Sequence, residues 1–149
     1  MSAQENATLV RHEFDLLNTH QTDTEWLDKI VAPLSEDFVL VDVPTGTTSS
    51  GRDALRTFCL FFVDAFPGSS TEITNMVATE DQVVVEFIGR GVNTGPLHLP
   101  TGDVPPTGRS VEIHFCEVRR IANGKIMSLH SYYDALGFMQ QLGFIPSQE

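Results

Sequence analysis

The chain has 149 residues, about the length of one typical domain, so we expect a single domain over residues 1–149 with its own core. It carries 20 acidic and 9 basic side chains, a net charge of −11, which argues against nucleic acid and anionic membranes as partners because few cations could neutralise phosphates. The start, MSAQENATL, lacks the pattern of a signal peptide, and no stretch approaches the roughly 20 apolar residues of a membrane span, so we expect a cytoplasmic protein.

The first helix is predicted over residues 7–19. Val10, Phe14 and Leu17 recur there at helical spacing and would form one apolar stripe. Asn6 is the candidate cap, because its side chain can accept hydrogen bonds from the free amides of a first turn. The stripe indicates that this helix packs against a core.

Two more helices and a strand are predicted before the chain changes character. A short helix begins at about residue 24 and ends before Pro33. Residues 38–43 alternate and predict a strand, and the polar stretch TGTTSSG leads from it into the third helix. That helix, over residues 51–66, places apolar side chains at i, i+3, i+4 and i+7: Leu55, Phe58, Cys59 and Phe62.

Behind the third helix the pattern changes to period two, which predicts four strands, over residues 71–79, 82–90, 110–121 and 125–133. Asn123-Gly124 predicts a tight hairpin, because both central residues of that turn need a positive φ. Residues 91–108 form a loop long enough to act as a lid. Helices grouped ahead of a largely antiparallel sheet predict an α+β domain, and a strongly curved sheet would leave a cavity beneath the helices.

Alternation along the strands predicts which side chains meet that cavity. In residues 110–121 the odd-numbered positions are the more apolar near the start, so we assign them to the interior: Val111, Ile113, Phe115, Glu117, Arg119 and Ile121. The same test assigns these residues of the neighbouring strands to the interior: Val83, Val85, Phe87, Gly89, Met127, Leu129, Ser131 and Tyr133.

Polar groups inside an apolar cavity are informative, since each needs a partner or a ligand. The candidates are Asp42, Glu117, Arg119, Ser131 and Tyr133. Glu117 and Arg119 could instead pair with each other at a strand end, and Asp42 could instead shape the turn before Pro44. For these three residues the sequence leaves a structural and a chemical role open.

His114, His130 and Asp134 are further acid/base candidates. Histidine is a common acid/base residue at neutral pH, but these two occupy strand positions assigned to the outer face, so they would reach the cavity only if the register differed by one residue. Asp134 precedes a helix predicted over residues 135–142, where it could cap the helix or face a pocket mouth. Capping would weaken it as a base, because the amides of the first turn stabilise the ionised carboxylate.

Several common motifs are absent from the sequence. There is no GxxxxGK motif, no GxGxxG, no GxSxG and no HExxH, so nucleotide, hydrolase-triad and zinc-protease interpretations have no support. The five histidines lie far apart without metal-ligand spacing, and we expect no metal. Cys59 and Cys116 lie in apolar segments without CxxC spacing and are predicted to be buried thiols.

Three segments carry a family resemblance: GRDAL at 51–55, PPTGRSVEIHF at 105–115 and NGKIMSLHSYYDALGFMQQLG at 123–143. Together they resemble the SnoaL-like polyketide and ester cyclases, in the same order and over nearly the whole chain. The resemblance implies a nuclear transport factor two-like fold, a cone-shaped α+β barrel whose curved, mostly antiparallel sheet wraps around three N-terminal helices with a pocket between them. It also implies frequent homodimers and, in the enzymes, ring closure of a hydrophobic substrate by aldol chemistry without a cofactor.

This chain departs from the family pattern at the end of its last strand. Members often carry a His-Trp-Asp run whose aspartate would fall at position 131, whereas this chain has serine there and retains only Asp134. The related limonene epoxide hydrolases resemble the segment SEDFVLVDVP, with Asp42 where they hold a water-binding amide. Epoxide hydrolysis by their mechanism is not expected, because their arginine and two aspartates would fall on Phe87, Gly89 and Ser131.

The resulting hypothesis is a small cyclase or isomerase of a polyketide-like or terpenoid intermediate, with no cofactor, a small hydrophobic substrate and a homodimeric state. Such chemistry needs a base that removes a proton beside carbonyl groups and a donor that stabilises the oxyanion. The candidate catalytic residues are Asp134, Asp42, Glu117, His114 and His130, and the candidate substrate contacts are Ser131, Tyr133, Phe87, Phe115, Leu129 and Arg119. The alternatives are a hydrophobic-ligand-binding protein without catalysis and a dimerisation module whose sheet is the interface.

Overall fold

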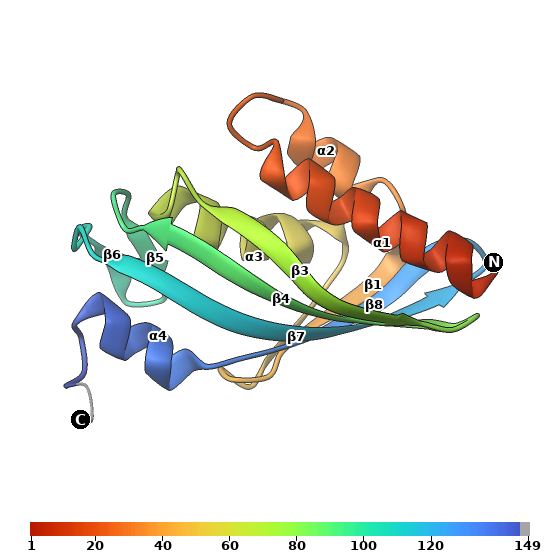
Figure 1. Ribbon diagram of the computed structural model, residues 1–149. Coiled ribbons are helices and arrows are strands. Elements are labelled where there is room, and N and C mark those ends of the chain that lie inside the picture. Colours follow the sequence, from red (N-terminus) through yellow and green to blue (C-terminus); the bar gives the residue numbers. More distant parts are fainter. Residues whose placement is uncertain (147–149) are drawn as a thin grey trace.

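The fold consists of helices packed against a curved six-stranded sheet in a computed structural model that describes residues 1–146 (Figure 1). The helices are α1 (Ala3–Asn18), α2 (Trp26–Val31), α3 (Arg52–Ala65) and α4 (Ala135–Leu142). The strands are β1 (Leu34–Asp42), β2 (Thr47–Ser50), β3 (Ser70–Ala78), β4 (Gln82–Val92), β5 (Leu97–Leu99), β6 (Gly102–Val104), β7 (Ser110–Ala122) and β8 (Lys125–Tyr133).

The main sheet has the strand order β2-β1-β8-β7-β4-β3. All its neighbouring pairs are antiparallel except β1 with β8, which are parallel. Figure 1 shows α1, α2 and α3 on one side of the curved sheet, with α4 continuing from β8. Phe138 of α4 packs against Phe62 and Phe66 of α3. The predicted α+β fold with a curved, mostly antiparallel sheet is confirmed. No helix within residues 1–146 is long and apolar enough to cross a membrane.

Helix α1 begins earlier than predicted, because Ser2 and not Asn6 is its cap. The Ser2 side chain accepts from the Glu5 amide at 3.1 Å, and the Glu5 carboxylate accepts from the Ser2 amide, which forms a capping box. Asn6 is fully buried instead and donates to the carbonyls of Thr79 and Glu80 at 2.9 and 3.0 Å. Asn6 therefore ties α1 to the turn after β3.

The polar stretch before α3 contains a strand that the sequence pattern did not predict. Thr47 to Ser50 form β2, which pairs with β1 at the edge of the sheet. All four residues are exposed, so no apolar alternation marks them as a strand. Gly51 follows with a φ of 88°, which a side-chain-bearing residue rarely adopts, and α3 begins at the next residue.

Strand β7 buries the face that its alternation predicted. Its inward residues are all buried: Val111, Ile113, Phe115, Glu117, Arg119 and Ile121. The residues between them are exposed or half-buried. The hairpin to β8 is also confirmed, because Asn123 and Gly124 have φ angles of 53° and 73°.

Strand β8 departs from simple alternation at its start. Ser128 pairs with Arg120, but Ile126 pairs with Ile121, which leaves Met127 as the extra residue of a bulge. Ile126 is therefore fully buried, whereas Met127, which we predicted to point inward, is only half-buried. Beyond the bulge the predicted register holds.

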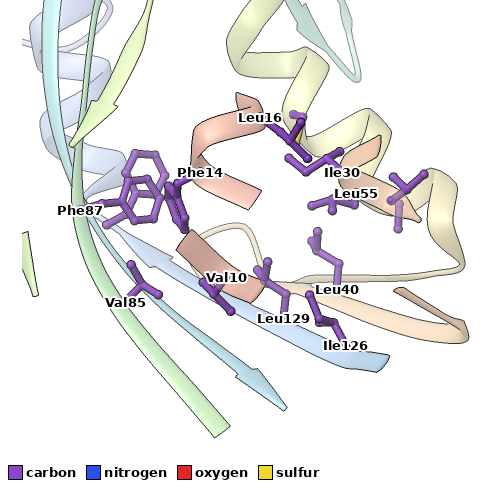
Figure 2. Packing of buried hydrophobic residues seen from close by; sticks show 14 of the residues in the cluster. Val10, Phe14, Leu16, Ile30, Leu40, Leu55, Val85, Phe87, Ile126 and Leu129 are labelled. Carbon is purple, nitrogen blue, oxygen red and sulfur yellow. The ribbon is translucent and has the colours of Figure 1, made fainter. Parts of the chain in front are cut away.

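The hydrophobic core lies between the helices and the inner face of the sheet. Figure 2 shows Val10 and Phe14 of α1 and Leu55 of α3 directed at side chains of the strands. The Phe14 ring meets the Phe87 ring of β4 edge-on, with centroids 4.7 Å apart. This packing explains the apolar stripe of α1.

The long segment after β4 is anchored to α3. It contains the small hairpin of β5 and β6, and the side-chain amide of Asn93 donates to the Ala65 carbonyl at 3.0 Å. His98 of the hairpin bridges Asp64 and Asp103 at 3.1 and 2.9 Å. Only Gly91 of residues 91–108 lines the cavity described below, so the predicted lid over the cavity is not found in this arrangement.

Candidate active site

A cavity lies between α1, α3 and the inner face of the sheet, where the sequence predicted a pocket. The volume of the cavity is about 100 Å³. Most of its wall is apolar, and six of the lining residues are phenylalanines: Phe14, Phe58, Phe62, Phe66, Phe87 and Phe115. Five residues predicted to be in the site line it: Phe87, Phe115, Leu129, Glu117 and Arg119. An apolar cavity with few polar groups is the usual form of a small-molecule site.

The polar part of the wall is a buried network around Arg119. Its Nε donates to Glu13 Oε1 at 2.8 Å, and its Nη2 donates to Glu13 Oε1 and, at 2.9 Å, to Glu117 Oε1. The Ser131 hydroxyl donates to the other Glu117 oxygen at 2.7 Å. Arg119 and Glu117 are each 3 % exposed, so two carboxylates share one cation out of contact with water.

Strand pairing and the α1 stripe bring this network together. Ser131 of β8 pairs with Glu117 of β7, and because Arg119 is two residues further along β7 it points to the same face. Glu13 reaches them from α1, where it lies three residues after Val10 on the face turned to the sheet. Glu13 was not predicted as a site residue, although a glutamate inside an apolar stripe was a usable signal.

Burial changes the protonation of the network. Loss of water contact raises the pKa of Glu117 above its ordinary value, and the charge of Arg119 and the Ser131 hydroxyl oppose this only in part. For Arg119 burial acts against the charged form, but the two glutamates outweigh it and raise the pKa of the guanidinium. Glu117 therefore holds a proton to higher pH than an ordinary glutamate and is a stronger base once ionised.

Two features of the cavity wall adjoin this network. Arg119 Nη1 is buried and has no hydrogen-bond partner among residues 1–146, while the guanidinium carbon lies 5.3 Å from the Phe14 ring centroid. Cys59 also lines the cavity, and burial raises the pKa of its thiol, so it stays neutral and is a poor nucleophile.

Asp42 and Tyr133 form a second polar pair behind the cavity wall. The Tyr133 hydroxyl donates to Asp42 Oδ2 at 3.1 Å, and burial raises the pKa of Tyr133. Asp42 Oδ1 is buried with no hydrogen-bond partner in the described part of the chain. Neither residue lines the cavity, but Tyr133 packs against Phe62 and Phe115, which do. Asp42 pairs with Ser131 across β1 and β8 and so shares the inward row.

Three predicted acid/base groups do not reach the cavity. His114 and His130 lie on the outer face of the sheet, because each alternates with inward residues of β7 and β8. Asp134 is exposed and accepts from the Gly137 amide at 2.8 Å, so it caps α4. The structure therefore does not place these three residues at the cavity. The register of β7 and β8 is the one predicted from their alternation, which leaves both histidines outside, and the carboxylate of Asp134 faces the first turn of α4.

Three lining residues are exposed and form the mouth of the cavity: Asn18, Ser70 and Arg90. The Asn18 side chain is bonded to the Thr71 backbone, accepting from its amide at 2.8 Å and donating to its carbonyl at 3.0 Å. Arg90 pairs with Glu72 at 2.8 Å. These residues come from three separate elements, and no sequence pattern pointed to them.

No group of three or more histidine, cysteine, aspartate or glutamate side chains within residues 1–146 is placed to hold a metal ion. The buried charged groups of the cavity wall are the two glutamates and Arg119, held together as ion pairs. Their chemistry is proton transfer and hydrogen bonding to a ligand oxygen.

The chain is similar to known proteins in sequence and in fold. The sequence profile of the SnoaL-like polyketide cyclases matches residues 12–142. A proposed SnoaL-like polyketide cyclase from Jannaschia sp. CCS1 superimposes with a TM-score of 0.83 at 22% identity, over 97% of this chain and 95% of that one.

Two further solved structures are similar. AclR from Streptomyces galilaeus, a proposed hydroxylase, gives a TM-score of 0.80 at 22% identity, over 99% of this chain and 87% of that one. TsrD from Streptomyces laurentii gives 0.76 at 19% identity, over 97% and 99%. At these identities the structures establish the fold alone. No curated protein matches the chain.

Proposed function

The chain belongs to the SnoaL-like polyketide cyclase family, and from this premise we propose that it is a cofactor-independent cyclase or isomerase that uses acid/base chemistry in its apolar cavity. The substrate would be a polyketide-like or terpenoid intermediate with an enolisable carbonyl group. The observation that carries the proposal is the buried carboxyl of Glu117, whose pKa is raised, on a wall that is otherwise mainly apolar.

Glu117 acts as the base in this proposal. Its ionised carboxylate removes a proton from a carbon next to a carbonyl group, and the electron pair of the broken C–H bond moves to the carbonyl oxygen to give an enolate. Arg119, which lines the cavity, stabilises the enolate through its positive charge. The enolate carbon then attacks a second carbonyl of the same molecule, and the proton on Glu117 passes to the new alkoxide.

Ser131 and Glu13 are positioning residues. Ser131 holds one Glu117 oxygen and leaves the other to Arg119, which fixes the direction of the carboxyl group. Glu13 fixes the guanidinium through Nε and Nη2. Position 131 carries a serine where family members often have an aspartate. Ser131 pairs with Glu117 of the neighbouring strand, so in this proposal the carboxyl group is supplied by Glu117 in the same inward row.

The remaining predicted residues take supporting roles. Phe87, Phe115 and Leu129 supply apolar contact to the substrate, since they line the cavity. Tyr133 and Asp42 support the wall from behind through the packing of Tyr133 on Phe115.

The test is proton exchange, which needs no knowledge of the natural substrate. A panel of β-keto esters and aryl ketones in D₂O is followed by NMR for deuterium uptake beside the carbonyl group, with and without protein. We expect Glu117→Gln to lower the protein-catalysed rate about 10²–10⁴-fold, the usual contribution of a general base. Asp134→Asn is the matched control, because it makes the same carboxyl-to-amide change at an exposed position.

Unchanged exchange in Glu117→Gln would overturn the assignment of the base. A hydrophobic-ligand-binding protein without catalysis is the second candidate, favoured by the six phenylalanines of the wall. Binding of the probes to the wild-type protein with exchange no faster than in buffer would establish that candidate instead.

A further inference from the structure

We propose that the hairpin of β5 and β6, residues 97–104, is a pH-controlled flap that His98 holds on the last turn of α3. His98 lies between two carboxylates: its Nδ1 is 2.9 Å from Asp103 Oδ1, and its Nε2 is 3.1 Å from Asp64 Oδ2. Asp103 is the partner of His98 on the opposite strand of the flap, and Asp64 belongs to α3. One imidazole ring therefore joins the strands of the flap to each other and the flap to the helix.

Only the charged form of His98 makes both contacts. An ionised carboxylate accepts hydrogen bonds and donates none, so each ring nitrogen must carry a hydrogen. Both nitrogens of the imidazolium do, whereas the neutral ring has one N–H group and one lone pair. Loss of the proton therefore leaves a lone pair facing a carboxylate oxygen, either across the flap or at the contact with α3.

The charges around His98 favour its charged form. The elements in closest contact with β5 are β6 and α3, and each turns one charged side chain to the ring, Asp103 and Asp64. The hydrogen bond to Asp103 is the main cause that raises the pKa of His98 above its ordinary value of 6.5; Asp64 adds to it, and partial loss of water contact opposes both. The contact that docks the flap is therefore complete below pH 6.5 and is lost as the pH rises through the raised pKa.

The contact between His98 and Asp64 is decisive, because little else ties the flap to the helix. Within residues 1–146 it is the only hydrogen bond between residues 97–104 and α3. Leu97 is buried in the core, but Leu99 and Val104 are only half-buried, and residues 100–103 are exposed. Once the contact is lost, the apolar packing of these few side chains is left to hold the flap.

Asn93 forms a hinge at the base of the flap that does not depend on pH. Its side-chain amide donates to the carbonyls of Ala65 and Gly95 at 3.0 Å each, and its Oδ1 accepts from the Thr107 amide at 2.8 Å. Asn93 is fully buried, and none of these groups titrates. Both ends of the segment that carries the flap therefore stay joined at the end of α3 while the flap moves.

The helix that receives the flap also forms part of the cavity wall. Asp64 lies between Val63 and Phe66, which both line the cavity, whereas Asp64 and His98 do not. The flap therefore acts on this helix from outside the cavity, and its docking does not depend on the chemistry proposed for the cavity.

The experiment measures the pKa of His98 and the opening of the flap by NMR in the same sample of wild-type protein, from about pH 5 to pH 9. Opening is followed as hydrogen exchange of the amides of residues 97–104, divided by the exchange rate of an unfolded peptide at each pH. We expect a pKa of His98 above 6.5 and a fall in protection of about threefold, the effect of a partly exposed ion pair, with its midpoint at that pKa. A pKa at or below 6.5, or protection that does not change with pH, would overturn the proposal.

Two variants and a control assign the change to His98. His98→Gln has no titratable group at this position. Asp64→Asn offers a side-chain N–H to the ring, so the neutral form can keep both contacts. In each variant we expect protection that no longer changes with pH, whereas Asp15→Asn, which removes an exposed carboxylate of α1, should keep the wild-type profile. A wild-type profile in His98→Gln or Asp64→Asn, or its loss in Asp15→Asn, would contradict the proposal.

Discussion

Glu13→Gln is the sharpest test of the buried network, because it removes one of the two negative charges that hold Arg119. Glu13 accepts from Arg119 Nε through both oxygens, at 2.8 and 3.3 Å, and from Nη2 through Oε1. Glutamine keeps one acceptor oxygen and turns an N–H₂ group toward the guanidinium, which cannot accept from it. The variant therefore loses one oxygen contact and the charge of the other, in a site that water does not reach.

The expected loss of stability is about 3 kcal/mol. Hydrogen bonds to charged groups contribute about 1.5–3 kcal/mol each, and breaking a buried ion pair costs about 3–5 kcal/mol. The lower part of that range applies, because Glu117 still pairs with Arg119 at 2.9 Å. For a chain of 149 residues this corresponds to a fall in Tm of about 6–12 °C.

The assay is urea denaturation at pH 7, with Asp15→Asn as the control. Asp15 is exposed on the same helix, so the same change of charge there should alter the free energy of unfolding by less than about 0.5 kcal/mol. If Glu13→Gln were as stable as Asp15→Asn, the argument would be wrong: the ion pair between Glu13 and Arg119 would not be buried, or water would replace the lost contacts.

The same variant has a functional readout that lost stability alone would not produce. The charge of Glu13 raises the pKa of Glu117, so its removal lowers that pKa. A base acts in its ionised form, and the rising limb of the exchange rate against pH should therefore move to lower pH in Glu13→Gln. A profile that is lower in amplitude but unmoved would contradict the coupling between the two glutamates.

Two further predictions concern stability. The folded-state pKa of Glu117 lies above its ordinary value of 4.5, so its contribution to stability is complete below that pH and is lost as the pH rises through the folded pKa. Glu117→Gln abolishes this titration. The free energy of unfolding of the variant minus that of the wild type, measured by urea denaturation, should therefore be larger at pH 8 than at pH 5. The opposite trend would mean that the pKa of Glu117 is not raised. Asp134→Ala should lower stability by about 1 kcal/mol through loss of the α4 cap, with unchanged exchange of probe protons, and a large fall in exchange would return Asp134 to the list of catalytic groups.

The faces of the strands could be predicted because alternation is a local property. Phe115, Glu117 and Arg119 are inward simply because each is two residues from the next, and the same rule kept His114 outside. The rule failed at Met127, where the bulge inserts one residue into β8 opposite β7. A bulge depends on the partner strand, so the pattern of one strand does not reveal it.

The site was only partly predictable, because its decisive contact joins distant parts of the chain. Glu117 and Arg119 were identified from one strand, with their mutual pairing as an open alternative, and they do pair. Glu13 is 106 residues from Arg119 in the sequence, and no periodicity links them. The mouth residue Asn18 was missed for the same reason: it joins the site through hydrogen bonds to Thr71.

The sequence by itself determined the helices, most of the strands and the faces they bury, since these follow from the spacing of apolar side chains along a few turns or one strand. It also indicated the family, through the segments at 51–55, 105–115 and 123–143, and the family profile matches residues 12–142. The tertiary structure alone decided that β1 lies parallel to β8, that α1 brings Glu13 to Arg119, and that Asp134 caps a helix rather than facing the cavity. Strand order and helix placement are set by the burial of the whole core at once, and the pKa of Glu117 is set by that burial too.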